Sequence, residues 1–175
     1  AAAPPKLALL HPTGWDDATP DLHAAFARVE KALGERVVRA ALPPVFDQAA
    51  DQRALVNFAE MAHHYRRYVE AGADRLGAET QKALKDGAAT SATDYLAALD
   101  VQAAMKDGLR DVFAVADILI CPAATGPAPE GLAFTGDSIF NGLWTFCGTP
   151  AITVPIEVAE NGLPIGVQLV AAEGQ

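Results

Sequence analysis

The chain has 175 residues, with 13 Lys and Arg against 22 Asp and Glu, so its formal net charge is −9. This length is enough for one domain, or a fragment of one, to bury a core without disulfides or metals. The acidic balance, with no basic run longer than Arg66-Arg67, argues against a nucleic-acid or anionic-membrane surface. No apolar run reaches the roughly 20 residues of a membrane-spanning helix, so we expect a cytoplasmic protein with neither nucleic acid nor membrane as a partner.

The first segment, residues 1–44, predicts a βαβ-like arrangement. An apolar run over residues 6–10 predicts a strand. Thr19-Pro20 then predicts a helix start, because threonine caps helices well and proline suits the first helical position. Apolar residues recur at helical spacing over 22–33, and residues 37–42 predict a second strand. Two strands joined through a helix are expected to lie parallel, with a right-handed crossover.

The second segment, residues 45–116, combines many alanines and charged residues with spaced apolar positions, a composition typical of helices. A three-four apolar rhythm over residues 55–69 predicts one helix that continues to Gly72. A shorter helix is predicted over residues 76–85. A capping box that begins at Ser91 predicts a third helix, which reaches the end of the segment.

The third segment, residues 117–175, changes period again. The continuous apolar run 118–121 predicts a strand covered on both faces. A Pro- and Gly-rich loop leads to a predicted aromatic helix over 137–146, and residues 151–158 and 165–171 predict an antiparallel hairpin. Together the three segments predict an α/β fold with a mixed sheet flanked by helices, in a single domain or domain fragment.

The residues alone give no activated nucleophile. Ser91 and Ser138 are the two serines, and neither stands in a GxSxG or SxxK motif. Cys121 and Cys147 lie inside apolar segments without a neighbouring histidine, so we expect buried, unreactive thiols.

A metal or cofactor site is not expected either. His63 and His64 are adjacent on a predicted helix, so they point about 100° apart and cannot both face one ion. No HExxH, DxD-type arrangement or GxGxxG loop is present, and the paired acids Asp16-Asp17 are expected to form a solvated surface.

The chain nevertheless resembles a known family. The matching features are an acidic residue, an apolar strand and a proline, then an aromatic segment, a Gly-Thr-Pro strand and a Gly-Leu-Pro strand that contains Val-Gln-Leu. They occupy 117–122, Phe140-Asn141, Trp144, 148–155 and 162–169. In order and spacing they resemble the C-terminal part of the amidase signature family, serine amidases that include the A subunit of transfer-RNA-dependent amidotransferases. The resemblance covers nearly the whole chain.

The resemblance implies where the catalytic residues lie. Family members use a serine, a second serine in a cis peptide and a lysine, and their serines belong to a Gly/Ser-rich segment that is absent from this sequence. We therefore expect a C-terminal portion of an amidase, with the N-terminal catalytic core and the Ser-cis-Ser-Lys triad missing. The parent protein would hydrolyse carbon–nitrogen bonds of linear amides, while the isolated chain would be inactive.

The same resemblance implies that this portion forms a wall of the substrate pocket. The candidate substrate-binding residues are Ser138, Phe140, Asn141 and Trp144. Ser138 falls where glutamine-using amidotransferases place an acidic residue, and they tend to have Arg around Lys82, so a less polar amide is favoured. The alternative for the aromatic residues is that they belong only to the core.

Two other functions stay open at this point. One is a non-catalytic assembly or binding subunit, which would form a homo-oligomer or complete a separate catalytic segment. The other is part of the A subunit of a glutamine-dependent amidotransferase. The partner common to the enzymatic hypotheses is a small-molecule amide, bound without a cofactor or a metal.

Overall fold

The computed structural model describes residues 4–174. Five strands form one sheet in the order β2-β1-β3-β5-β4. β1 runs parallel to both β2 and β3, whereas β5 runs antiparallel to β3 and to β4. The strands are β1 (Leu7–Leu10), β2 (Val37–Ala40), β3 (Ile118–Pro122), β4 (Ala151–Val158) and β5 (Pro164–Ala171). The predicted mixed sheet and α/β fold are confirmed.

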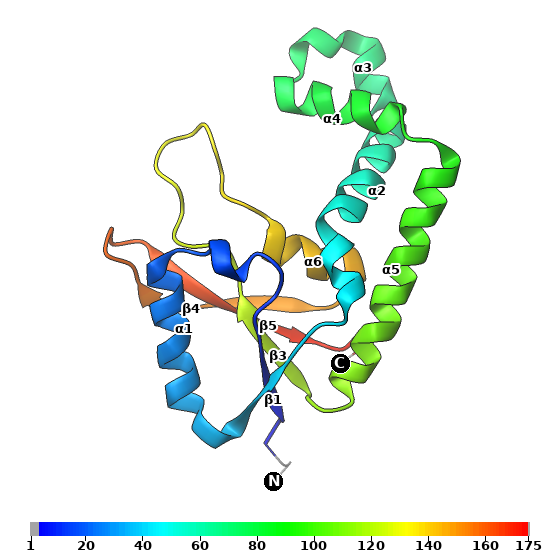
Figure 1. Cartoon of the computed structure of the whole chain (residues 1–175). Coiled ribbons are helices and arrows are strands. Elements are labelled where there is room, and N and C mark those ends of the chain that lie inside the picture. The colour runs from blue at the N-terminus through cyan, green and yellow to red at the C-terminus, as the bar shows by residue number, and fades with distance from the viewer. Residues whose placement is uncertain (1–3, 175) are drawn as a thin grey trace.

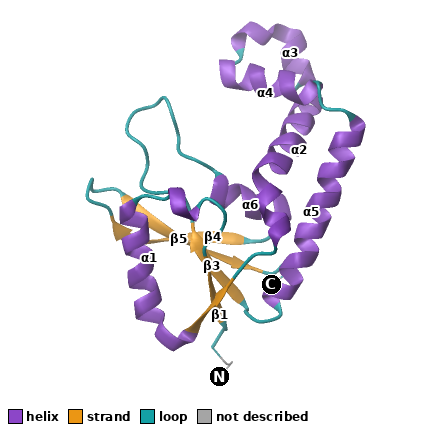
Figure 2. Ribbon diagram, in the orientation of Figure 1, coloured by secondary structure: helices purple, strands orange, loops and turns teal. Residues whose placement is uncertain are grey.

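Helices lie on both sides of this sheet (Figure 1). One side carries α1, and the other carries α2, α5 and α6, while α3 and α4 form a tip at the far end of α2 and α5 (Figures 1 and 2). The helices are α1 (Pro20–Leu33), α2 (Ala49–His64), α3 (Arg66–Gly72), α4 (Ala78–Ala88), α5 (Ala92–Phe113) and α6 (Ile139–Cys147). Within residues 4–174, each helix is too short or too polar to cross a bilayer.

Alternating side chains of the central strands create two cores. On β1, Leu9 packs with Phe26 of α1, whereas Leu10 packs on the other side with Met105 of α5. β3 divides in the same way, since Ile120 faces α1 and its neighbours face α5. This alternation follows from the two-residue period of a strand, and it explains why both faces of the sheet read as apolar in the sequence.

The capping residues Thr19 and Ser91 correctly predicted where α1 and α5 begin. The Thr19 hydroxyl accepts the N–H of Leu22 at 3.4 Å at the start of α1. The Ser91 hydroxyl accepts the N–H of Asp94 at 3.1 Å at the start of α5. Both bonds satisfy backbone donors that have no partner within the helix.

The helical middle differs from the prediction at one point. The apolar rhythm over 55–69 predicts one helix, but the backbone turns at Tyr65 (φ −97°, ψ 6°) and divides it into α2 and α3. The tip can then fold back, and α4 packs closely against α2. At Gly87 of α4, an added Cβ would overlap the carbonyl of Phe58, so only a glycine permits this approach.

This contact gives a stability prediction. Gly87→Ala should lower the free energy of unfolding by about 2 kcal/mol, because the methyl group would push α4 away from the α2 backbone. Urea denaturation measures the effect. Lys85→Ala is the matched control in the same helix, since Lys85 is exposed, and its urea midpoint should stay unchanged. Equal midpoints for the two variants would contradict the close approach.

Candidate functional site

A cavity of about 360 Å³ lies beyond the carboxyl end of β3. Its walls are the loop that joins β3 to α6, Leu22 of α1, the middle of β4 and the start of β5; Figure 2 shows the course of these elements. Most lining groups are apolar or backbone, and polar side chains come from Thr125, Thr135, Asp137 and Thr153. Ligands of open α/β sheets bind at this end of parallel strands, so the position is suited to a small molecule.

The start of α6 lies directly beside this cavity. Asp137 lines the cavity, and its Oδ1 accepts the N–H of Ile139 at 2.8 Å, so the carboxylate caps the helix. Ser138 follows and is exposed, and its Oγ accepts a hydrogen bond from Nη2 of Arg53 on α2 at 3.0 Å. One turn later Asn141 is also exposed. Two of the four predicted substrate-binding residues therefore lie on an accessible polar edge.

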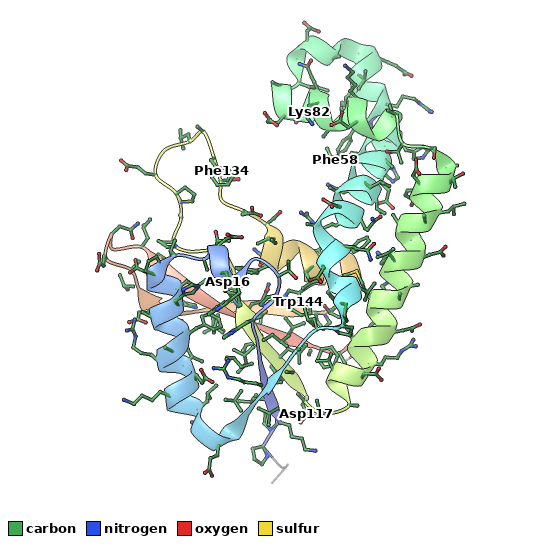
Figure 3. All side chains as sticks on the ribbon, in the orientation of Figure 1. Asp16, Phe58, Lys82, Asp117, Phe134 and Trp144 are labelled. Atoms are coloured by element: carbon green, nitrogen blue, oxygen red, sulfur yellow. The ribbon has the colours of Figure 1, made fainter. Side chains whose placement is uncertain are left out.

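The two aromatic candidates lie elsewhere. Phe140 is 0 % exposed and belongs to the core on the α1 side, while Trp144 is 1 % exposed and belongs to the core on the α5 side. Figure 3 places Trp144 at the centre of the molecule, among the side chains that join α6 to the sheet. This burial supports the alternative that both rings serve the core, where they hold α6 in position.

The sequence analysis did not identify Gln168 of β5, which forms a hydrogen bond with the Asn141 side chain. Gln168 on β5 is 6 % exposed, and its Nε2 donates to Asn141 Oδ1 at 3.0 Å. Its Oε1 accepts from the Cys121 thiol, with 3.8 Å between sulfur and oxygen. A single glutamine within an otherwise apolar strand was the available signal, because a buried amide needs partners.

The thiols are protonated in this environment. Burial raises the pKa of Cys121 to about 12, against a weaker opposing effect of the Trp144 indole. The indole Nε1 makes no hydrogen bond of normal geometry within residues 4–174. Burial likewise raises the pKa of Cys147 to about 11. The two cysteines are therefore poor nucleophiles, and Cys121 acts as a donor to Gln168.

Other residues considered above are remote from this edge. Lys82 lies on α4 in the tip (Figure 3), where its Nζ pairs with Asp86 at 2.7 Å and its pKa is raised by that hydrogen bond. His63 and His64 are exposed at the end of α2. Among the residues that the structure describes, no group of three or more metal-ligating side chains comes together.

Comparison with known proteins decides the family. The model of the amidase family matches residues 1–175. The chain belongs to the amidase family. It is 29% identical over 115 residues to the A subunit of the glutamyl-tRNA(Gln) amidotransferase of Aliarcobacter butzleri, an alignment that covers 59% of this chain and 25% of that protein. The corresponding protein of Agathobacter rectalis is 39% identical over 84 residues, or 43% of this chain and 16% of that protein.

Solved amidase structures share the fold. A crystal structure described as an amidase superposes with a TM-score of 0.83 at 20% sequence identity, covering 96% of this chain and 42% of that one. This identity is too low to carry more than the fold. The chain spans about a quarter or less of the length of these curated relatives and about two fifths of this structure.

The buried thiols give a prediction about reactivity and pH. With pKa values of about 12 and 11, both cysteines should resist Ellman's reagent at pH 8 in the folded chain and react fully in denaturant. Because an unfolded thiol ionises near pH 8.5 while the folded one keeps its proton, the free energy of unfolding should fall as the pH rises above about 9. Reaction of one thiol per folded chain within seconds would contradict the burial of Cys121 and Cys147.

Proposed function

We propose that this chain is the C-terminal, substrate-side portion of an enzyme that hydrolyses the carbon–nitrogen bond of a small-molecule amide. The observation that carries the proposal is the match to the amidase family over residues 1–175. Ser138 Oγ accepts a hydrogen bond from the cationic Arg53, and a guanidinium cannot take a proton, so Ser138 is not activated as a nucleophile requires. Ser91 Oγ donates to the Asp94 carboxylate at 2.7 Å, but this exposed pair forms the cap of α5 and does not line the cavity.

In the parent enzyme, as the family resemblance implies, a serine outside this chain attacks the amide carbonyl. A lysine and a second serine in a cis peptide transfer the protons. The residues of this chain then bind and orient the substrate. Among the predicted site residues, Ser138 and Asn141 offer exposed polar groups at the start of α6, where Ser138 directly follows the cavity-lining Asp137, while Phe140 and Trp144 hold this helix in place. No cofactor or metal is required for this division of roles.

The edge of the sheet supports the proposal that further protein covers this chain. Within residues 4–174, β4 is an edge strand that pairs only with β5, and apolar side chains on it are exposed. Ile152 is 63 % exposed and Val158 is 66 % exposed. A long apolar edge is rarely left bare, because its unpaired backbone groups and side chains recruit other chains. Residues 1–175 would thus be a domain fragment, completed by a catalytic segment or by a second copy.

A second candidate is the A subunit of an amidotransferase, or else a non-catalytic assembly subunit. The curated relatives named above are amidotransferase A subunits, which favours the first of these. Hydrolysis and amide transfer differ in the acceptor of the released group, and the described residues include no feature that selects one acceptor. A cytoplasmic location also belongs to this proposal, by analogy with such enzymes.

Activity of the isolated chain tests the proposal. The purified chain should not hydrolyse simple aliphatic and aryl amides above the buffer rate, measured by ammonia release. Its activity should appear only together with a polypeptide that supplies the serines and the lysine. Saturable turnover by the chain alone, stopped by a serine-directed inhibitor, would overturn the assignment of catalysis to residues outside it.

The exposed edge gives a second prediction. The chain alone should self-associate through β4, and the double variant Ile152→Lys/Val158→Lys should shift it toward the monomer, because two charges oppose strand pairing. Sedimentation velocity measures the distribution. Val38→Lys, on the opposite edge strand β2, is the control and should leave the association unchanged. A wild-type chain that sediments as one monomeric species at high concentration would contradict the role of β4.

A further inference from the structure

The Arg53 side chain of α2 packs against the start of α6. The guanidinium lies against α6 at Gly142, where an added Cβ would be 2.5 Å from its Cζ. Its Nη2 donates to Ser138 Oγ. Within residues 4–174, no carboxylate comes within 4.0 Å of it, whereas Arg28 and Arg39 each pair with a glutamate. A half-buried cation in a chain of net charge −9 that lacks such a partner has free donors to offer.

The hydroxyl of Ser138 is turned into a donor by this contact. Its oxygen accepts the N–H of Arg53, which leaves the hydroxyl hydrogen free to point away from the guanidinium. The Asp137 carboxylate caps Ile139, and within residues 4–174 it makes no ion pair with Arg53. Arg53 and Ser138 therefore present adjacent N–H and O–H donors at the start of α6.

Asn141 adds a third donor whose orientation is fixed from the core. The protonated Cys121 thiol donates to Gln168 Oε1, which fixes the orientation of the Gln168 amide. The Nε2 group of that amide then donates to Asn141 Oδ1 on α6. This bond occupies the carbonyl oxygen of Asn141 and leaves its NH₂ group free. Ser138 directly precedes α6 and Asn141 lies three residues later in its first turn, a spacing that places the two side chains on neighbouring positions of the same side of the helix.

We propose that Arg53, Ser138 and Asn141 form a carboxylate-binding site, and that the amide handled by the parent enzyme carries a carboxylate away from the scissile bond. The three side chains offer only donors, which fits an anion with two acceptor oxygens. A guanidinium binds a carboxylate through two parallel hydrogen bonds, which also fixes its orientation. Gln168 is a positioning residue, since it acts through Asn141.

This inference rests on the proposed function for the identity of the amide, and it differs from the sequence expectation of a less polar substrate. That expectation rested on Ser138 and Lys82, which stand where the glutamine-using relatives have an acidic residue and an arginine, whereas the structure brings a different arginine, Arg53, to Ser138. Carboxylate binding itself needs no catalysis, so it can be measured on the chain alone.

The test is a titration of the ¹⁵N-labelled chain followed by NMR. The probe is succinamate, which carries one amide and one carboxylate, and the comparison probe is the neutral succinamide at equal ionic strength. Succinamate should shift the Arg53 Nε–Hε signal saturably, with a dissociation constant of about 1 mM, whereas succinamide should not shift it. In Arg53→Gln, the affinity read from the Asn141 side-chain NH₂ signals should fall about 10- to 100-fold.

Two further variants keep the test independent of folding. Ser138→Ala removes an exposed hydroxyl and should weaken binding severalfold while the spectrum stays dispersed. Arg75→Gln is the matched control, because Arg75 is an exposed arginine of the tip that donates to the Ala71 carbonyl, and it should bind as the wild type does. Equal shifts with succinamide, a linear response without saturation, or the same loss in Arg75→Gln would each overturn the proposal.

The parent enzyme provides the kinetic counterpart. Arg53→Gln should raise KM for an amide that carries a carboxylate about 10- to 100-fold, with little change in kcat, and should raise KM for neutral amides far less. Equal losses on both substrates would overturn the carboxylate site even if amide hydrolysis is established. Hydrolysis by the chain alone would overturn the proposed function and leave the NMR result standing.

Discussion

The anchoring of α6 on both faces of the sheet is the constraint on which the candidate site depends. Phe140 enters the core beside α1, and Trp144, one turn later, enters the core beside α5. Burial of two large rings fixes both the position and the rotation of a nine-residue helix that would be marginal alone. Ser138 and Gly142 lie about half a turn away from these rings, so they must face α2 and Arg53.

Features set by neighbouring residues could be predicted from the sequence. The caps at Thr19 and Ser91 satisfy backbone donors two or three residues away, and such patterns are visible in a short window. The strands of the sheet were predictable for the same reason, since their two-residue alternation or continuous apolar runs are local. The unreactive character of Cys121 followed from its apolar neighbours, and its raised pKa agrees.

Features set by distant contacts could not be predicted. The bond between Arg53 and Ser138 joins residues 85 apart in the chain, and no pattern marks either of them. Apolar spacing also cannot tell a ring that lines a pocket from one that fills a core, because both positions favour the same side chains, as Phe140 and Trp144 illustrate. The break at Tyr65 likewise depends on how the tip packs back on α2, which outweighs a continuous helical rhythm.

The residue at the position of Gly142 can be compared among the sequences of relatives. A methyl group at this position would come within 2.5 Å of Arg53 Cζ, so the guanidinium would have to move from the place where it contacts Ser138. If the proposed carboxylate site is correct, relatives with alanine or a larger residue at the position of Gly142 would hold such an arginine differently and bind a carboxylate less tightly. The absence of a side chain at one helical position would thus sort members of the family by the charge of the amides that they accept.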